Sequence, residues 1–320
     1  MSFEYNNVKD AYERIKKYLR KTPLEESFYL GDESKRYFFK LESLQRAKSF
    51  KIRGALNKMM TLTKEEINYG VAAISSGNHG SSVSYAATIL GINNVKIIVP
   101  QNTAQSKIDK IKYFGADVIL LGRNYDEAHS LGMKFIKEQK LTYIDAYYSD
   151  PEIYSGQGTV GLEILEQNYD IDTIVVPVGG GGLITGIAVA AKAIKPNIRI
   201  IGVQTEACPS MIKSYEDNIF YEEYPYEESL CDALVGGIGK LGYDMAKNYV
   251  DDFIAVSEES IAKAVSFMAK EEKYIVEAGS CTTVAAAMDF RERIGGKNIA
   301  LILSGGNIDG DLLTYILSKY

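Results

Sequence analysis

A lysine between two apolar residues is the first candidate for chemistry in this sequence. Lys51 lies between Phe50 and Ile52, within the segment Ser-Phe-Lys-Ile-Arg-Gly-Ala over residues 49–55. An apolar setting desolvates the ammonium group and lowers its pKa, so the neutral amine becomes available as a nucleophile and a Schiff-base partner. For this lysine alone, the alternative is a surface side chain at the start of a helix.

A second candidate is the turn over residues 75–79, here called the serine turn. It consists of Ser75, Ser76, Gly77, Asn78 and His79. It follows an apolar run and opens a helical pattern, where unpaired N–H groups and the helix dipole favour an anion such as a carboxylate. The alternative is structural, because the serine hydroxyls could simply cap the helix.

Four consecutive glycines form a third candidate, here called the glycine loop. It consists of Gly179, Gly180, Gly181 and Gly182 and is followed by Leu183. Such a loop between a strand and a helix lets the backbone approach a phosphate closely. No Gly-Lys-Ser/Thr follows, so it is not a P-loop, and Ile184 stands where a dinucleotide fingerprint needs its third glycine. Glu206 lies near where a ribose-binding acid would be, so a nicotinamide-dependent oxidoreductase is a competing hypothesis.

The fourth candidate is Ser304, followed by Gly305, Gly306 and Asn307 after the last apolar run. Ligands of open α/β sheets bind at the carboxyl ends of strands, although an ordinary turn is the alternative here. Together the four segments supply an amine nucleophile, an anion-binding turn, a phosphate cradle and a hydroxyl. Pyridoxal phosphate is the cofactor that uses all four.

The elements that must position these residues alternate between apolar runs and amphipathic helices. Continuous apolar runs predict strands of a parallel sheet covered on both faces, and the alternation predicts a doubly wound α/β fold with right-handed crossovers. The predicted strands are 71–74, 95–99, 118–121, 173–178, 198–203, 253–256 and 299–303. The predicted helices are 81–90, 158–167, 183–194, 258–271 and 282–294. The acidic, aromatic segment 215–228 is predicted to be a surface loop with aromatic anchors, with partner binding as the alternative.

Composition excludes several classes of protein. The 320 residues carry a net charge of −6, so no global basic field attracts nucleic acid or an anionic membrane. No apolar run approaches the roughly 20 residues that span a bilayer, and the first residues lack a signal-peptide pattern, so a cytoplasmic protein is expected. Cys208, Cys231 and Cys281 form no Cys-x-x-Cys pair and are expected to be reduced. Having only His79 and His129 argues against a multi-histidine metal centre.

The four segments, in this order, resemble the fold-type II pyridoxal-phosphate enzymes, specifically the threonine/serine dehydratase (ammonia-lyase) and serine racemase family. The stretches 99–103, 113–117, 155–159 and 202–204 agree as well. The resemblance implies an α/β fold like that of the tryptophan synthase β chain, with twisted, mostly parallel sheets covered by helices. It implies a smaller domain over 48–146, and a larger, cofactor-binding domain over 1–47 and 147–320. It also implies a homodimer or higher homo-oligomer.

The resemblance implies a role for each candidate residue. Lys51 would bind the cofactor as a Schiff base and move the Cα proton, with Phe50 against the cofactor. Asn78 would bond the cofactor's 3′-oxygen, and Ser304 would face its pyridine nitrogen. The glycine loop with Leu183 would cradle the phosphate, and the serine turn would hold the carboxylate of a small amino-acid substrate.

The implied activity is dehydration and deamination of L-threonine or L-serine to a 2-oxo acid and ammonia. A serine hydroxyl opposite the pyridine nitrogen does not force that nitrogen to stay protonated, which favours prompt β-elimination over transamination. The alternatives on this scaffold are an amino-acid (serine) racemase, or a dehydratase of another β-hydroxy amino acid such as hydroxyaspartate. Ser76 matches the racemase's acid/base on the second face. A non-catalytic binding module is disfavoured, because it needs no imine-forming lysine.

Some residues depart from the family pattern. Ala47 and Lys48 precede Ser-Phe-Lys where the family commonly has Thr-Gly, so a charged residue is expected beside the site. Ala146 and Tyr147 fall where prolines are common, so the wall above the cofactor is expected to differ.

The family's racemases carry two acidic metal ligands at positions that hold Gln204 and Ser210 here, so no metal site is expected. If a metal did bind, Glu206 and Asp145 would be the acids to suspect. The sequence ends soon after the Ser304 motif, so a catabolic-type enzyme without a C-terminal regulatory domain is expected.

Overall fold

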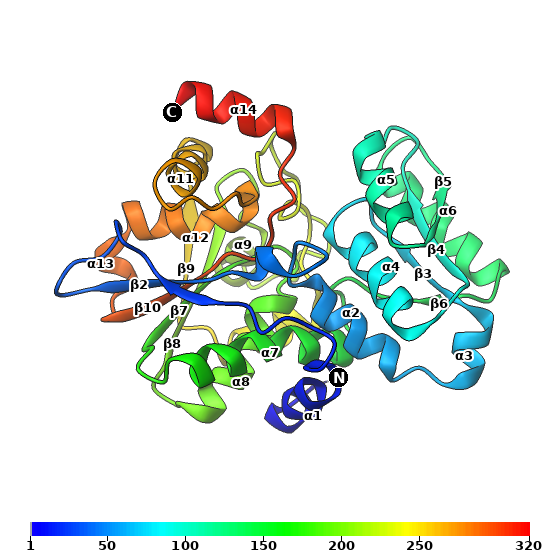
Figure 1. Cartoon of the computed structure of the whole chain (residues 1–320), viewed down its shortest axis with the longest axis horizontal. Helices are drawn as coiled ribbons and strands as arrows, with labels where there is room; N and C mark the ends of the chain where they lie inside the picture. The colour runs from blue at the N-terminus through cyan, green and yellow to red at the C-terminus, as the bar shows by residue number, and fades with distance from the viewer. Residues whose placement is uncertain (1) are drawn as a thin grey trace.

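The computed structural model describes residues 2–320, which form two sheets covered by helices (Figure 1). The strands are β1 (Leu24–Glu26), β2 (Arg36–Lys40), β3 (Val71–Ile74), β4 (Val95–Val99), β5 (Asp117–Leu120), β6 (Thr142–Tyr143), β7 (Thr173–Pro177), β8 (Arg199–Thr205), β9 (Asp252–Val256) and β10 (Asn298–Ile302). The helices are α1 (Tyr5–Ile15), α2 (Lys51–Met60), α3 (Lys64–Tyr69), α4 (Asn78–Leu90), α5 (Gln105–Tyr113), α6 (Tyr125–Glu138), α7 (Pro151–Gln167), α8 (Gly182–Ile194), α9 (Ser210–Glu216), α10 (Lys240–Ala246), α11 (Glu258–Lys270), α12 (Ala278–Asp289), α13 (Arg291–Ile294) and α14 (Gly310–Lys319), with a 3-10 turn at Glu42–Leu44.

Both sheets are mainly parallel, as the continuous apolar runs predict. The six-stranded sheet has the order β1-β2-β10-β7-β8-β9, and the four-stranded sheet has the order β5-β4-β3-β6. Among the described strands, only β1 and β2 pair antiparallel. The predicted α/β class with twisted parallel sheets under helices is therefore confirmed.

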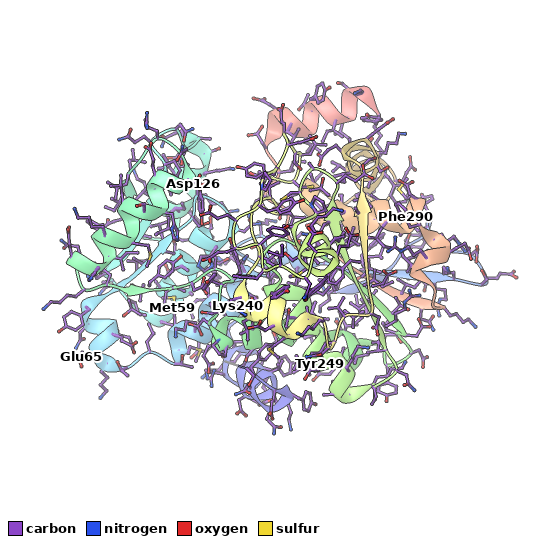
Figure 2. All side chains as sticks on the ribbon, turned by 180° about the vertical axis from the view of Figure 1, so that it is seen from behind. Met59, Glu65, Asp126, Lys240, Tyr249 and Phe290 are labelled. Atoms are coloured by element: carbon purple, nitrogen blue, oxygen red, sulfur yellow. The ribbon has the colours of Figure 1, made fainter. Side chains whose placement is uncertain are left out.

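The two sheets belong to two units that lie side by side in Figure 1. The smaller unit is the four-stranded sheet with α3 to α6, and the larger unit is the six-stranded sheet with its helices. All strands of the smaller unit lie between residues 71 and 143, inside the segment 48–146, whereas the strands of the larger unit come from both sides of it. The domain boundaries themselves stay a prediction. Figure 2, seen from behind, places Lys240 at the seam between the units, with Glu65 and Phe290 toward their outer ends.

All seven predicted strands are present, to within a residue or two at their ends. The sequence patterns miss β1 and β6, which have only three and two residues, and β2, whose five residues begin and end with a charged side chain. Helices α4 and α7 begin three and seven residues earlier than predicted, at Asn78 and Pro151, whereas α11 begins at Glu258 as predicted. The first turn of α4 holds small or polar residues and therefore lacks an amphipathic pattern. The prediction of one helix over 282–294 is wrong, since Phe290 breaks it into α12 and α13 with a non-helical backbone (φ −123°, ψ 32°).

Helices α2 and α8 both pack closely against α7, and this contact positions two of the candidate segments. A Cβ added at Gly156 would lie 2.6 Å from the Cα of Gly54, and one added at Gly158 would lie 2.7 Å from the carbonyl oxygen of Gly186. Glycine is therefore required for the backbones to approach this closely. As a result, the lysine that starts α2 and the glycine loop that starts α8 are supported by one helix.

A buried ion network joins α2 to the larger sheet and to α7. The Arg53 guanidinium contacts Glu42 and Glu163, each at 2.7 Å, and the Lys40 ammonium reaches Glu163, also at 2.7 Å. All four side chains are almost completely buried. Because Arg53 follows Lys51 by two residues, this network fixes the first turn of α2.

Three further sequence expectations concern the surface and the thiols. Cys208, Cys231 and Cys281 are free and buried. After α9 ends at Glu216, the rest of the segment 215–228 is irregular, and Tyr215 and Phe220 pack partly buried against the core, as the anchored-loop hypothesis predicts. Over residues 2–320, no helix is long and apolar enough to cross a membrane.

Candidate active site

The Lys51 segment and the Ser304 turn lie side by side beyond the end of β10. Ser49 forms an antiparallel bridge with Gly305, and the backbone N–H of Phe50 donates to the carbonyl oxygen of Ser304 at 2.9 Å. Two motifs about 250 residues apart in the sequence are thus joined directly by their backbones.

Lys51 is the first residue of α2, and its side chain is half-buried. Its ammonium nitrogen donates to the carbonyl oxygen of Ala146 at 3.1 Å and lies 5.4 Å from the ring centroid of Phe50 and 5.6 Å from that of Tyr147. Desolvation lowers the pKa of Lys51 to about 8, although the charge of Asp145 acts in the opposite direction. The alternative of an ordinary surface lysine does not fit a side chain held between two rings.

The glycine loop joins β7 to α8 and has a conformation that side chains would disrupt. Gly181 has a left-handed backbone (φ +91°), and a Cβ at Gly180 would lie 2.1 Å from the Tyr147 ring. No side chain caps α8, so the N–H groups of its first turn face the loop. This cradle suits the phosphate of pyridoxal phosphate.

The serine turn joins β3 to α4, and neither serine caps the helix. Gly77 is the N-cap residue, and the Ser75 hydroxyl accepts a hydrogen bond from the N–H of Gly77 at 3.2 Å. The Ser76 hydroxyl has no hydrogen bond to any of residues 2–320, and the space beside Gly77 is open to at least 4 Å. The capping alternative is therefore not what the structure shows, and the N-terminus of α4 is left open for an anion.

The ring of His79 is buried and faces the backbone. Its Nε2 lies 2.9 Å from the carbonyl oxygen of Ile144, so Nε2 carries the proton. Burial, reinforced by the nearby charge of Lys51, lowers the pKa of His79 to about 4, so the ring is neutral at physiological pH. Only the backbone N–H of His79 is therefore placed to help bind a carboxylate.

Asn78 contacts Asn307, which follows the Ser304 turn, and Glu277, which the sequence patterns did not assign. Its side-chain nitrogen donates to the two carboxylate oxygens of Glu277 at 2.9 and 3.1 Å, and its side-chain oxygen accepts from the amide of Asn307. Burial raises the pKa of Glu277, although the hydrogen bond from Asn78 opposes the shift. The one local signal for Glu277 is its place directly before a helix that begins with small residues.

Ser304 is buried at the carboxyl end of the larger sheet. Its hydroxyl oxygen lies 3.1 Å from that of Ser280, and the Ser280 hydroxyl is in turn bonded to the backbone of Gly305. The position of the Ser304 hydroxyl is thereby fixed, with no carboxylate hydrogen-bonded to it among residues 2–320. A fixed neutral hydroxyl suits a pyridine nitrogen that is not kept protonated.

The chain segment that returns from the smaller to the larger unit forms another wall of the site. Asp145 accepts hydrogen bonds from the N–H groups of Tyr147 at 3.1 Å and Ser149 at 2.9 Å. The Tyr154 hydroxyl donates to the carbonyl oxygen of Tyr147 at 2.5 Å and accepts from the N–H of Gly242. Tyr147 therefore has a fixed backbone, and its ring covers the glycine loop, which makes this wall aromatic.

The stretch around Gln204 is organised by hydrogen bonds. The Gln204 side-chain oxygen accepts from the N–H groups of Met211 and Ile212 at 2.9 and 3.1 Å, and its nitrogen lies 3.4 Å from the Ser210 hydroxyl. Glu206 is exposed. Within residues 2–320, no three His, Cys, Asp or Glu side chains come together as a set of metal ligands.

Comparison with known proteins identifies the family of this chain. The family model described as "Pyridoxal-phosphate dependent enzyme" matches residues 15–305. An L-threonine ammonia-lyase of Thermotoga maritima is 39% identical over 98% of this chain and 78% of its own length. A catabolic L-threonine dehydratase of Staphylococcus aureus is 37% identical over 95% of this chain and 88% of its own. The structure of maize serine racemase superposes with a TM-score of 0.92, at 33% identity, covering 100% of this chain and 98% of that one.

The match spans nearly the whole chain and includes all four candidate segments. The structure brings Lys51, the glycine loop and Ser304 around one seam, and the dinucleotide hypothesis for the glycine loop is thereby set aside. The chain belongs to the family of pyridoxal-phosphate-dependent enzymes, with the fold-type II architecture.

Proposed function

We propose that this enzyme dehydrates and deaminates L-threonine or L-serine, producing a 2-oxo acid and ammonia. The observation that carries the proposal is the pairing of a half-buried amine, Lys51, with a buried neutral hydroxyl, Ser304, across the end of β10. The relatives named threonine ammonia-lyase and threonine dehydratase support the substrate class.

Each group around the seam has a definite task in this proposal. Pyridoxal phosphate, when bound, supplies the electron sink that acidifies the Cα–H of an amino acid. The glycine loop binds the phosphate through backbone N–H groups, Phe50 packs against the ring, and Asn78 donates to its 3′-oxygen. The open N-terminus of α4, with the serine turn, binds the substrate carboxylate.

Lys51 has the properties of the proton-transfer group. Its pKa of about 8 leaves part of the amine neutral at physiological pH, which is the form that accepts a proton. The Ala146 carbonyl oxygen orients the amine. Elimination of the β-hydroxyl requires proton removal from one face of Cα only, so one such base is sufficient.

A second candidate function is racemisation of an amino acid such as serine. Racemisation needs an acid/base on each face of Cα. The Ser76 hydroxyl, which is free of hydrogen bonds within residues 2–320 and lies beside open space at Gly77, favours this alternative. Dehydration of another β-hydroxy amino acid, such as hydroxyaspartate, uses the same groups.

A substrate panel tests the proposal. Purified holoenzyme and its Lys51→Ala variant are given L-threonine, L-serine, D-serine and β-hydroxyaspartate, and both 2-oxo acid release and change of chirality are measured. We expect 2-oxo acid from L-threonine or L-serine with the wild type and none with the variant. A change of chirality without release of 2-oxo acid would show that the enzyme is a racemase and not a lyase. Release of 2-oxo acid from hydroxyaspartate alone would show that threonine and serine are not its substrates.

We also infer that the enzyme works in the cytoplasm as a homodimer or higher homo-oligomer. Three free, buried cysteines suit a reducing compartment, and the family resemblance supports the oligomer. Sedimentation velocity at micromolar concentration measures the mass directly, and a monomer of the chain mass would contradict this inference.

A further inference from the structure

A chain of hydrogen bonds leads from α5 of the smaller unit to Asn78. The ammonium of Lys110 donates to the side-chain oxygen of Asn307, and the side-chain nitrogen of Asn307 donates to the side-chain oxygen of Asn78. The side-chain nitrogen of Asn78 then donates to Glu277. Every donor in the chain points the same way, from a cation toward a carboxylate.

The two charged ends favour one orientation of both asparagine amides, and the Ala47 carbonyl oxygen favours the same orientation of Asn307. A lysine ammonium has no acceptor, so Asn307 must turn its oxygen toward Lys110 and its nitrogen toward Asn78. Asn78 must then turn its oxygen toward Asn307 and its nitrogen toward Glu277. The two Glu277 oxygens belong to one carboxylate, so a single hydrogen of the Asn78 amide nitrogen serves both, and the second N–H is left for another acceptor.

The chain also crosses between the two units. Lys110 and Asn78 lie on α5 and α4, whereas Asn307 and Glu277 lie at the carboxyl edge of the larger sheet. The Asn307 backbone is held independently of Lys110, since its N–H donates to Glu277 at 3.1 Å. The direction of the Asn307 amide depends on the lysine and on Ala47, whose carbonyl oxygen accepts from the Asn307 side-chain nitrogen at 3.3 Å.

Lys110 is suited to this task because its charge has no direct partner. The side chain is half-buried, and no carboxylate of residues 2–320 lies within 4 Å of its nitrogen. The ammonium is therefore bonded to a neutral amide, and a charge-assisted hydrogen bond of this kind is stronger than one between neutral groups.

We propose that Lys110 is a positioning residue that, through Asn307, holds the Asn78 amide with an N–H toward the cofactor and thereby raises cofactor affinity. The inference rests on the contact between Asn78 and the cofactor in the proposed function. It assigns a role in cofactor binding to a lysine of the smaller unit that none of the four sequence segments contains.

The ionisation of Lys110 gives the inference a pH signature. Burial lowers its pKa to about 8, with Glu277 acting against the shift and Lys48 acting with it. Above this pH, the neutral Lys110 amine holds the Asn307 amide less firmly. The cofactor affinity of the wild type then falls relative to that of a variant whose residue 110 stays charged. Arginine stays protonated throughout this range, so Lys110→Arg provides that reference.

The experiment measures the dissociation constant of pyridoxal phosphate from apoprotein by absorbance titration at pH 7 and pH 9. The variants are Lys110→Met, Lys110→Arg, Asn307→Ala and the double variant Lys110→Met/Asn307→Ala. The matched control is Lys107→Met on the same helix, α5. It removes the exposed ion pair in which the Lys107 ammonium lies 3.0 Å from the Asp232 carboxylate. Thermal melts verify that each apoprotein is folded.

We expect Lys110→Met to weaken binding about tenfold at pH 7, in line with the loss of one charge-assisted hydrogen bond. Lys110→Arg should recover most of the affinity and keep it at pH 9, and Lys107→Met should stay within twofold of wild type. The double variant should be no weaker than Asn307→Ala, because the lysine acts through that asparagine.

Two results would overturn the inference. In the first, Lys110→Met binds the cofactor as tightly as the wild type. In the second, Lys107→Met loses as much cofactor affinity as Lys110→Met, which would show that any contact of α5 with the larger unit matters equally. The lyase assay separates failure of the Lys110 inference from failure of the proposed function. Unchanged affinity with intact activity rejects only the role of Lys110, whereas absent lyase activity rejects the proposed reaction and leaves the titration valid.

Discussion

At the residue scale, Lys51 shows how a common side chain becomes reactive. Its amine is half-buried between Phe50 and Tyr147 and is bonded to a carbonyl oxygen. No carboxylate of residues 2–320 forms an ion pair with it. Desolvation therefore outweighs the attraction of Asp145, and the pKa of Lys51 falls to about 8. A lysine in water has a pKa near 10.4, so the reactive neutral form becomes far more abundant at neutral pH.

This lowered pKa predicts the reactivity of the apoprotein. The rate of acetylation at Lys51, measured by peptide mass spectrometry, should rise with pH to a midpoint near 8, because only the neutral amine reacts. Asp145→Asn should move the midpoint lower, since Asp145 raises the pKa. A midpoint at 10 or above would show that the amine is solvated.

Ser76 separates the two candidate reactions. Since its hydroxyl does not cap α4, Ser76→Ala should leave the thermal melt and most elimination from the L-enantiomer unchanged. Racemisation, and elimination from the D-enantiomer, should fall by roughly 10²–10⁴-fold, which is what a positioned acid/base contributes. Ser75→Ala is the matched control, because it removes the turn hydrogen bond to Gly77 instead. Equal losses of L-elimination and racemisation with an unchanged melt would place Ser76 in the shared chemistry.

At the scale of elements, the start of α2 depends on buried charge. Removing Arg53 leaves Glu42 buried without an ion-pair partner and Glu163 with Lys40 alone, and breaking a buried pair in this way costs about 3–5 kcal/mol. Arg53→Met should therefore lower the free energy of unfolding by about that amount in urea denaturation. Arg36→Met is the control, because Arg36 pairs with Glu26 on the surface, where such pairs contribute about 1 kcal/mol or less. Similar losses in both variants would contradict a special role for the buried network.

The junction of β8 and α9 leads to a prediction about metals. Gln204 already uses its oxygen to accept from two N–H groups of α9, and Glu206 is exposed. Magnesium and calcium prefer several anionic oxygens, which this junction does not offer. Lyase activity should therefore survive treatment with a chelator. A loss of activity that magnesium restores would reveal ligands elsewhere.

The sequence could predict those elements whose signals are local. Continuous apolar runs predicted seven of the described strands but not β2, whose five residues begin and end with a charge. The glycine loop and Lys51 were recognisable from their neighbours alone. The network of Lys110, Asn307, Asn78 and Glu277 could not be predicted, because its members lie up to 229 residues apart and meet only when two sheets pack. The breaks at Phe290 and the early start of α4 likewise depend on tertiary packing, which overrides helical periodicity.

At the scale of the whole molecule, the candidate ligand groups are shared between the two units. Asn78 belongs to the smaller unit, whereas the glycine loop and Ser304 belong to the larger one. A ligand that binds only the folded protein stabilises it by about 2.7 kcal/mol at 100 times its dissociation constant. Pyridoxal phosphate should therefore slow hydrogen exchange in β3 and β4 as well as in β7 and β8. Protection of the larger sheet alone would show that the smaller unit does not take part in binding.

The pairing of β2 with β10 has a consequence for synthesis on the ribosome. Arg36 is in register with Asn298, so the early strand finds its neighbour only about 260 residues later. At 5–20 residues per second, the nascent chain waits roughly 10–50 s before this edge of the sheet can close. During that interval Phe38 and Phe39 have no β10 to pair with, and Lys51 lacks the Ser304 turn. The chain is therefore exposed to aggregation until β10 is made near the end of translation, and its active site is among the last parts to be assembled.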